Sequence, residues 1–486
     1  MGNIRAVISY PNRANDMNLG PKNINFLRMS LNSKIERDGT FFWADSVKLL
    51  PALIVGLIAL IILGLSLAAL WFDNSVTNLA VIIFAIFYLS VSACRLLACI
   101  IPIPKTAMPE RLPNEDHFDW PSYSVFVPLY QEVSVVRELI SHLSKLDYPV
   151  DKLDITLICE RDDHETIKGL WSALDKPFSL AIVEPGGPKT KPNALNFALE
   201  RTESALVTIY DAEDRPHPDQ LKTAVRAFEQ NPNWGALQAP LIFDNARKNF
   251  LTRQFALEYA ALFYVWLPFL SRLGCPFPLG GTSNHIRRSV LDQIGGWDSH
   301  NVTEDADLSF RLALLSSQIG YILPPTYEEV VEDWQSWSGQ RSRWMKGFIQ
   351  TFNLHMHAPF RPGGYAGLVR FTTLQLTIGV TLLTGFCHLP FLSMLAGSRL
   401  GGYVSGDPVQ LPTIFLTCLI IGYVSGILCA FIGACRSKQF FLLKDTVWMP
   451  IYWITLFAPT LRAAIELRFN PFYWNKTRHG KSKTRA

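Results

Sequence analysis

The stretch that decides the fold is SALVTIYDAEDRPHPDQL, residues Ser204–Leu221. Its apolar run, Ala205–Tyr210, has the length and composition of a buried strand. Three acids follow this run at once: Asp211, Glu213 and Asp214. Like charges crowded at the end of a buried strand are costly unless a cation lies beside them. The stretch therefore predicts a strand whose carboxyl end holds a cation.

Strand-like and helix-like runs alternate upstream of this stretch. The strand-like runs are Ser122–Tyr130, Asp154–Glu160 and residues 178–184, and the helix-like runs are 132–146, 165–174 and 193–202. Alternation at this spacing is typical of βαβ units, whose parallel sheets bind ligands at the carboxyl ends of the strands. The sequence therefore predicts an α/β fold with a site at that edge of the sheet.

Long charge-free runs flank the α/β region on both sides. They are Leu49–Phe72, Ser75–Cys94, Phe371–Ser398 and Pro408–Cys435. Each is long enough for a membrane helix, which needs about 20 apolar residues. A further run, Thr446–Leu461, is shorter and contains two prolines, so it predicts an interfacial or re-entrant element.

Lysine and arginine gather in the N-terminal arm, in the 436–438 link and in the C-terminal tail, whereas the turn between the first two spans has neither. The positive-inside rule then predicts a multi-pass protein of the cell (cytoplasmic or inner) membrane, with both termini and the α/β domain in the cytoplasm. We expect no cleaved signal peptide. The predicted order is a cytoplasmic arm (1–45), two spans (46–102), the α/β domain (105–368), two spans (369–435), interfacial or re-entrant helices (440–468) and a basic tail (469–486).

Residues 255–274 are apolar and aromatic but include Glu258 and Arg272. This pattern indicates an amphipathic helix at the membrane surface, and a buried core helix explains it equally well.

Cysteine spacing and net charge exclude other classes of protein. The eight cysteines contain no CxxC pair, which favours reduced packing residues over disulfides or zinc ligands. The net charge of +4 is explained by the basic membrane flanks, so we expect no nucleic-acid partner.

The acids after the decisive strand suit a metal ion. Asp211 and Glu213 are two positions apart, so both can reach one hard divalent cation such as Mg²⁺, which takes one or two carboxylates plus substrate phosphates. A helix-capping turn is the structural alternative, and it suits Asp214 better than Asp211.

Two later segments each allow a structural and a chemical interpretation. In the first, Thr303 is a good helix N-cap with Glu304 and Asp305 in the first turn, but one of these carboxylates also suits a general base. In the second, Gln340, Arg343 and Trp344 share one helical face. That face belongs either to a surface helix or to a sugar site in which the indole stacks on the ring and Arg binds phosphate or hydroxyls.

The order of these motifs, with "DAE", "TED" and "QRSRW" following one another inside a domain flanked by spans, resembles the membrane-embedded family 2 glycosyltransferases. This group contains the cellulose, hyaluronan and chitin synthases. The resemblance covers Ser122–Thr351 and the layout of the spans. It implies a GT-A-like, mostly parallel nucleotide-sugar-binding domain inserted between transmembrane helices.

The resemblance also implies roles for individual residues. Asp211 and Glu213 match the D-x-D pair that binds Mg²⁺ or Mn²⁺ on the donor diphosphate. Asp305 matches the general base, with Glu304 beside it. The nucleotide-sugar-binding set is Glu160, Asp162, Lys191, Asn196, Gln340 and Arg343, and the acceptor-binding pair is Trp344 and Thr303. Two departures stand out, since the first acidic site is "ERDD" rather than D-D-G and no F-x-V-T gating motif follows Trp344.

The implied function is inverting, metal-dependent elongation of a β-linked polysaccharide from a UDP-sugar at the cytoplasmic membrane face. The implied partners are the UDP-sugar, the growing glycan, the bilayer and export or periplasmic subunits. Two alternatives are a transferase that adds one sugar to a lipid carrier and a non-catalytic nucleotide-sugar sensor or export subunit.

Overall fold

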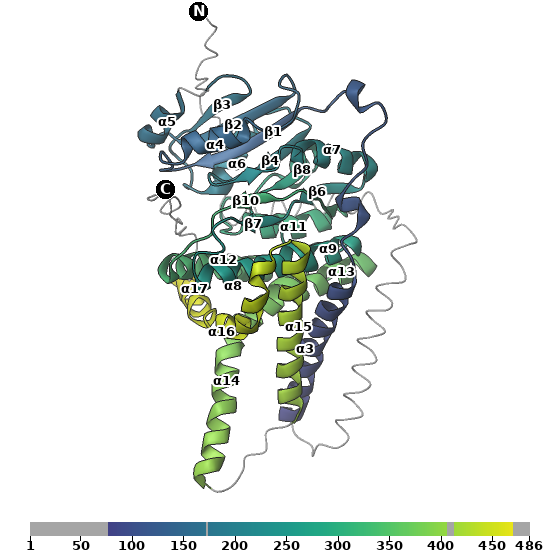
Figure 1. The fold of residues 1–486 in the computed structure, drawn as a ribbon, viewed down its shortest axis with the longest axis vertical. Coiled ribbons are helices and arrows are strands. Elements are labelled where there is room, and N and C mark those ends of the chain that lie inside the picture. Colours follow the sequence, from purple (N-terminus) through teal and green to yellow (C-terminus); the bar gives the residue numbers. More distant parts are fainter. Residues whose placement is uncertain (1–75, 172–173, 406–412, 470–486) are drawn as a thin grey trace, which may run out of the picture.

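The structure is a computed structural model that describes residues 76–171, 174–405 and 413–469. The predicted first span, Leu49–Phe72, the N-terminal arm and nearly all of the basic tail lie outside these residues. The described chain forms an α/β part and a helical part, which Figure 1 places one above the other. The candidate site lies where the two parts meet.

A seven-stranded sheet forms the centre of the α/β part. Its strand order is β3-β2-β1-β4-β8-β6-β9. The strands are β1 (Tyr123–Leu129), β2 (Leu153–Glu160), β3 (Phe178–Val183), β4 (Leu206–Ile209), β6 (Trp234–Gln238), β8 (Asn284–Arg287) and β9 (Gln318–Tyr321). All neighbours pair in parallel except β8, which is antiparallel to both β4 and β6. The predicted α/β class with a mostly parallel sheet is confirmed.

Helices follow the strands as the alternating pattern predicts. They are α4 (Val136–Leu143), α5 (His164–Leu170), α6 (Lys191–Leu199), α7 (Gln220–Gln230), α10 (Arg288–Ile294) and α11 (Glu304–Leu314), with short 3-10 turns η3 (Lys105–Ala107) and η4 (Glu115–His117). Helix α6 begins where the Thr190 hydroxyl accepts a hydrogen bond from Asn193 N and Pro192 occupies the first turn. This start fixes Lys191 at the edge of the sheet.

A second, three-stranded sheet lies directly after the acidic turn. It consists of β5 (Arg215–Pro216), β10 (Thr326–Glu328) and β7 (Leu241–Phe243), in that order. The strand pair β10–β7 is parallel, with Glu328 opposite Phe243. The small sheet therefore brings the end of β10 close to the acids that follow β4.

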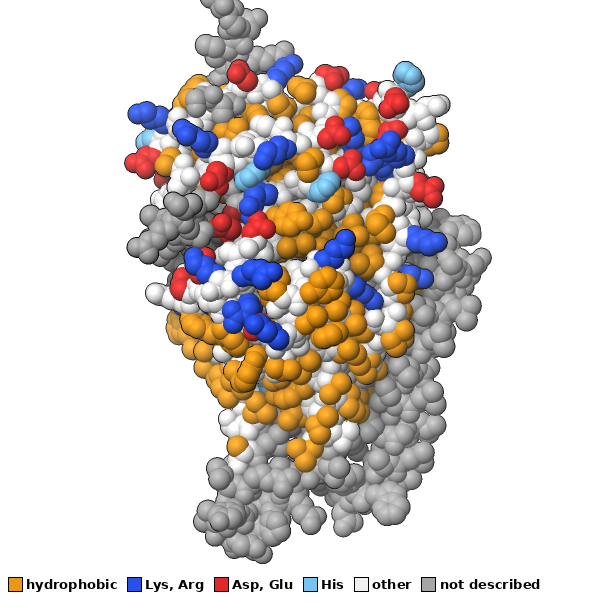
Figure 2. All heavy atoms as spheres, viewed as in Figure 1, with side chains coloured by type: hydrophobic (Ala, Val, Ile, Leu, Met, Phe, Trp, Pro, Cys, Tyr) orange, Lys and Arg blue, Asp and Glu red, His pale blue; other side chains and the backbone are white. Residues whose placement is uncertain are grey.

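The helical part contains two helices that are long and apolar enough to cross a membrane, Gly364–Pro390 and Leu416–Arg436. They overlap the predicted spans Phe371–Ser398 and Pro408–Cys435. The elements are α3 (Val76–Ile100), α12 (Trp334–Met356), α13 (Gly364–Leu374), η7 (Gln375–Gly379), α14 (Val380–Ser405), α15 (Thr413–Arg436), η8 (Phe440–Trp448), α16 (Met449–Ile454) and α17 (Phe457–Phe469). Figure 2 shows apolar side chains covering the lower described surface and charged ones gathered above them, as membrane association requires.

The segment around residues 255–274 forms α8 (Phe250–Ala261), the π-helix η6 (Leu262–Trp266) and α9 (Leu267–Arg272). Most of its side chains are buried, and the Cβ of an alanine at Gly433 of α15 would touch the backbone of Ala260. The segment thus packs between the α/β part and α15.

Candidate active site

A cavity of about 740 Å³ begins at the carboxyl ends of β1, β2 and β4 and continues among α3, α14, α15 and α16. Its walls include most of the residues that the sequence singles out. These are Glu160, Lys191, Asp211, Glu213, Thr303, Glu304, Asp305, Gln340, Arg343 and Trp344. Residues far apart in the sequence therefore meet in one hollow.

The three acids after β4 do not have equal surroundings. Asp214 is fully buried, and its carboxylate accepts hydrogen bonds from Asp211 N (2.7 Å) and from the Thr282 hydroxyl. It therefore shapes the turn, but it does not cap α7 as the structural alternative predicts, because the N-cap of α7 is Asp219. Glu213 faces the cavity, and burial together with the charge of Asp211 raises its pKa to about 8.

Lys191 is the cation that the protein itself supplies to these acids. Its amine donates to the Asp211 carboxylate and to the Gly281 carbonyl oxygen (2.9 Å). Burial disfavours the charged amine, but Asp211, Glu304 and Asp305 outweigh it, so the pKa of Lys191 lies above its ordinary value. One lysine therefore offsets part of the charge of these three carboxylates.

The oxygen ligands at this edge fit a hard divalent cation that arrives with a phosphate. No group of three or more His, Cys, Asp or Glu side chains within the described chain is placed to hold a metal by itself. Two carboxyl groups, those of Asp211 and Glu213, line the cavity, and burial together with the charge of Asp211 raises the pKa of Glu213. Such a pair suits Mg²⁺ or Mn²⁺ completed by phosphate oxygens.

Asp305 lies in the first turn of α11, directly above the Gly280–Gly281 turn. A Cβ added to Gly281 would come within 2.9 Å of the Asp305 carboxylate, and Gly281 has a φ of +70°. Only glycine accommodates both the backbone angle and this approach. Burial raises the pKa of Asp305, and burial with the charge of Asp305 raises the pKa of Glu304 to about 7.

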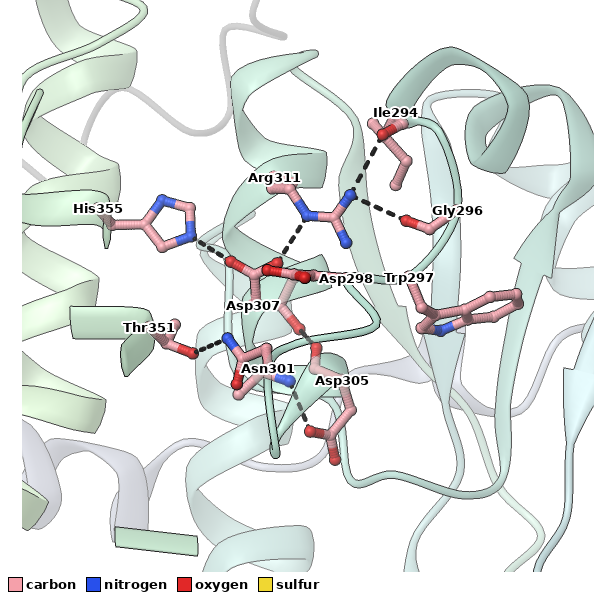
Figure 3. A network of polar contacts seen from close by, with 12 residues as sticks. Ile294, Gly296, Trp297, Asp298, Asn301, Asp305, Asp307, Arg311, Thr351 and His355 are labelled. Atoms are coloured by element: carbon pink, nitrogen blue, oxygen red, sulfur yellow. Dashed lines mark hydrogen bonds and ion pairs between the residues drawn. The ribbon is translucent and has the colours of Figure 1, made fainter. Parts of the chain in front are cut away.

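A buried network of hydrogen bonds fixes helix α11, which carries Asp305, against α12 (Figure 3). Asp307 accepts hydrogen bonds from Arg311 (2.7 Å) and from Nε2 of His355 on α12 (3.1 Å). Arg370 of α13 donates to Nδ1 of His355 (3.0 Å), and since arginine only donates, His355 carries its proton on Nε2. Burial alone would raise the pKa of Asp307, but Arg311 and His355 hold it below its ordinary value.

The face of α12 predicted from the sequence does turn toward the cavity. Oε1 of Gln340 and Nε of Arg343 are buried, and neither has a hydrogen-bond partner within the described residues. Trp344 stacks on Tyr259 of α8, with ring centres 6.4 Å apart and planes 26° apart. Unsatisfied buried polar atoms beside an aromatic face indicate a ligand site.

Two predicted residues lie outside the cavity lining. Asp162 is exposed and pairs with Lys189, which does line the cavity. Asn196 donates to the Trp297 carbonyl oxygen (2.7 Å) and accepts from Trp297 N (2.9 Å), so it holds a loop rather than facing the hollow. Sequence reasoning also missed cavity residues, above all Glu258, Tyr259 and Glu328. The sequence offered one clue to Glu258 and Tyr259, which is that both lie in the apolar segment 255–274, and none to Glu328.

The raised pKa values predict how the metal-free protein responds to pH. Glu213 and Glu304 have folded-state pKa values of about 8 and about 7, against an ordinary value of 4.5. Between pH 5 and 8 the folded state therefore binds more protons than the unfolded state, and stability falls as pH rises. We expect a lower Tm at pH 8 than at pH 5.5 in the presence of EDTA. The Glu213→Gln, Glu304→Gln double variant should show a smaller difference; an equal difference would contradict the assignment.

Comparison with known proteins agrees with this geometry. The chain is 29% identical over 267 residues to a beta-monoglucosyldiacylglycerol synthase of Synechocystis (54% of this chain, 55% of that protein). It is 28% identical over 244 residues to cellulose synthase 2 of Novacetimonas hansenii (49% of this chain, 15% of that protein). The chain thus spans about half the length of the first relative and less of the second.

Among solved structures, the mannosyltransferase PcManGT of Pyrobaculum calidifontis, in complex with GDP-Man and Mn²⁺, has the same fold. Its TM-score is 0.52 at 18% identity, over 85% of this chain and 99% of that one. The family model described as glycosyl transferase family group 2 matches residues 206–461, slightly more than half of the 486 residues. The chain therefore belongs to glycosyl transferase family group 2.

Proposed function

We propose that this glycosyltransferase elongates a β-linked glycan from a UDP-sugar, with inversion, at the cytoplasmic face of a membrane that its flanking helices cross several times. The observation that carries the proposal is the extent of the cavity, whose lining includes both Asp305 at the sheet edge and Thr384 and His388 in the helical part. An acceptor can therefore reach the general base from the membrane side while the donor occupies the opposite end.

The walls of the helical part suit a sugar chain. Thr377, Thr381, Thr384 and His388 recur on one face of η7 and α14 and line the cavity. Tyr423 and Trp453 line it as well, and the Tyr423 hydroxyl lies 2.7 Å from Nε2 of His388. Hydroxyl groups and aromatic faces are the surfaces on which sugar rings bind.

The reaction proposed is a single displacement at the anomeric carbon. Asp305 removes the proton of the acceptor hydroxyl as the oxygen attacks. The new glycosidic bond forms while the bond to the diphosphate breaks, and the electron pair leaves with the nucleoside diphosphate. Gln340 and Arg343 supply hydrogen-bond groups for that diphosphate, and Trp344 stacks on the acceptor. One displacement without an enzyme nucleophile converts an α-linked donor into a β-linkage.

Asp211 and Glu213 are the residues that would hold Mg²⁺ or Mn²⁺. When bound, the metal would neutralise charge on the leaving diphosphate. Lys191, already hydrogen-bonded to Asp211, holds that carboxylate in place at the cavity wall. Glu160 and Lys189 line the same end of the cavity and suit the nucleotide.

A second candidate acceptor is a membrane lipid that receives one sugar. Apolar side chains such as Val380, Leu383 and Leu419 also line the helical part, and they suit acyl chains. The relative from Synechocystis is named for a glycolipid product. A non-catalytic sensor has no such support, because the acids proposed for metal binding and for proton removal are all present.

Product size distinguishes the two acceptors. Membranes containing the protein would receive labelled UDP-glucose or UDP-N-acetylglucosamine, with Mg²⁺, Mn²⁺ or EDTA. We expect metal-dependent release of UDP and a polymeric product. A single labelled glycolipid would refute elongation and favour the lipid acceptor.

Blocking the helical part should shorten the product. Thr384→Trp places a bulky ring in the cavity, so we expect shorter chains while the first transfer, measured as initial UDP release, continues. Ala396→Trp lies on the exposed side of the same helix and serves as the control. Equal chain lengths in both variants would contradict passage of the glycan through this part of the cavity.

A further inference from the structure

The carboxyl group of Glu328 lines the cavity but has no part in the reaction described above. Glu328 ends strand β10, is 9% exposed and lines the cavity. Within the residues that the structure describes, its carboxyl group has no hydrogen bond or ion pair. No sequence pattern singles out Glu328, because it stands in an ordinary acidic stretch, "YEEVVED".

Glu328 lies between the proposed metal pair and the aromatic face. On one side it is close enough to Asp214, Glu213 and Asp211 for their charges, after burial, to raise its pKa. On the other side, Phe243 is its partner in the β10–β7 pairing. The Phe243 ring is 4.5 Å from Tyr259, and Tyr259 stacks on Trp344.

A largely buried carboxyl group without a hydrogen-bond partner opposes folding, because it loses part of its hydration and Lys191 offsets only part of the negative charge around it. Such a group persists where a ligand provides the missing partner. A metal ion is a poor match for it, because no three acids among the described residues converge on one point. A hydroxyl group between the metal pair and the stacked rings is a good match.

We propose that Glu328 binds a hydroxyl group of the acceptor and so positions the acceptor for attack. The inference rests on the transfer reaction proposed above. The position of Glu328 in the fold favours contact with the acceptor over contact with the nucleotide. Glu160 and Lys189 lie at the β2–α6 end of the cavity, whereas Glu328 belongs to the small sheet and is close enough to Tyr259 for its charge to act on that ring's hydroxyl group.

The experiment compares Glu328→Gln with Glu229→Gln, which removes a carboxylate from the exposed face of α7. Two quantities are measured in membranes supplied with UDP-glucose or UDP-N-acetylglucosamine and Mn²⁺: sugar incorporated into product and UDP released. The affinity of the purified protein for UDP with Mn²⁺ and its Tm are measured separately. We expect Glu328→Gln to lower incorporation about ten- to hundredfold, the effect of losing a hydrogen bond to a charged group. UDP affinity should stay within about twofold, and Tm should be equal or higher.

Unchanged incorporation in Glu328→Gln would overturn the proposal. A tenfold loss of UDP affinity would also overturn it, because Glu328 would then serve the metal or the nucleotide. A fall in the Tm of Glu328→Gln would instead assign a structural role to Glu328. The variant Glu328→Asp keeps the carboxyl group on a shorter side chain, so we expect it to have the wild-type Tm but lower incorporation than the wild type. If the wild-type protein itself incorporates no sugar from either donor, the proposed transfer reaction fails and this inference fails with it.

Discussion

Replacing Asp305 with Asn should reduce sugar transfer by about 10²- to 10⁴-fold, the usual contribution of a general base. Asparagine has the same shape, so it still fits above Gly281, where the carboxylate comes within 2.9 Å of an added Cβ. It cannot accept a proton from the acceptor hydroxyl. The affinity for UDP with Mn²⁺ should persist, because the groups proposed for the diphosphate lie on other elements.

Asp292→Asn is a matched control, because Asp292 is exposed and pairs with Arg288 on α10. It should transfer sugar at the wild-type rate. Near-normal turnover in Asp305→Asn would exclude Asp305 as the base. Glu304→Asn and Glu304→Gln would then be tested next, since Glu304 also lines the cavity.

Stability gives an independent measurement on the same variant. Burial raises the pKa of Asp305, so the ionised carboxylate destabilises the folded state at neutral pH. Asp305→Asn should therefore have a Tm at pH 7 equal to or above that of the wild type while transfer is lost. A drop in Tm together with the loss of activity would indicate misfolding rather than the loss of a base.

Local patterns account for what the sequence predicted well. The strand at Leu206–Ile209 and the acids after it form one continuous segment, so the run of apolar residues and the abrupt change to charge are both visible without a fold. The same holds for the first turn of α11 and for the spacing of Gln340, Arg343 and Trp344. Each of these is a relation between residues a few positions apart.

Contacts between distant segments account for what the sequence did not predict. Glu328 faces the cavity only because β10 pairs with β7 and β5, and no local pattern specifies that pairing. Asn196 matches a nucleotide-side motif, yet its side chain holds the loop at Trp297, 101 positions away. The role of Arg341 is equally hidden, because its partners lie on two other helices.

Those partners make Arg341 the subject of the largest expected effect on stability. Its guanidinium group donates two hydrogen bonds to Glu258 of α8, at 2.7 and 2.6 Å, and one to the hydroxyl of Tyr452 of α16, at 3.1 Å. It also lies over the rings of Phe255 and Trp344, at 4.3 and 4.6 Å from their centres. One side chain thus joins three helices beneath the aromatic face of the site.

Arg341→Met leaves Glu258 without its cation in a largely buried position. Breaking a buried ion pair on one side costs about 3–5 kcal/mol, and we expect the lower end because Glu258 is 30% exposed at the cavity. Thermal unfolding in detergent should show a large drop in Tm. Arg462→Met is the control, since Arg462 is half exposed in its pair with Glu466 and should change stability by about 0.5 kcal/mol or less.

Adding Glu258→Gln to Arg341→Met tests the cause of that loss. If the cost comes from an uncompensated charge, removing the charge should recover part of the stability, so the two substitutions will not be additive. Additive losses would mean that packing of the Arg341 side chain against Phe255 and Trp344, rather than the ion pair, stabilises this junction.

In either case Trp344 loses a neighbour, so we also expect a higher KM for the acceptor in Arg341→Met, with little change in the affinity for UDP.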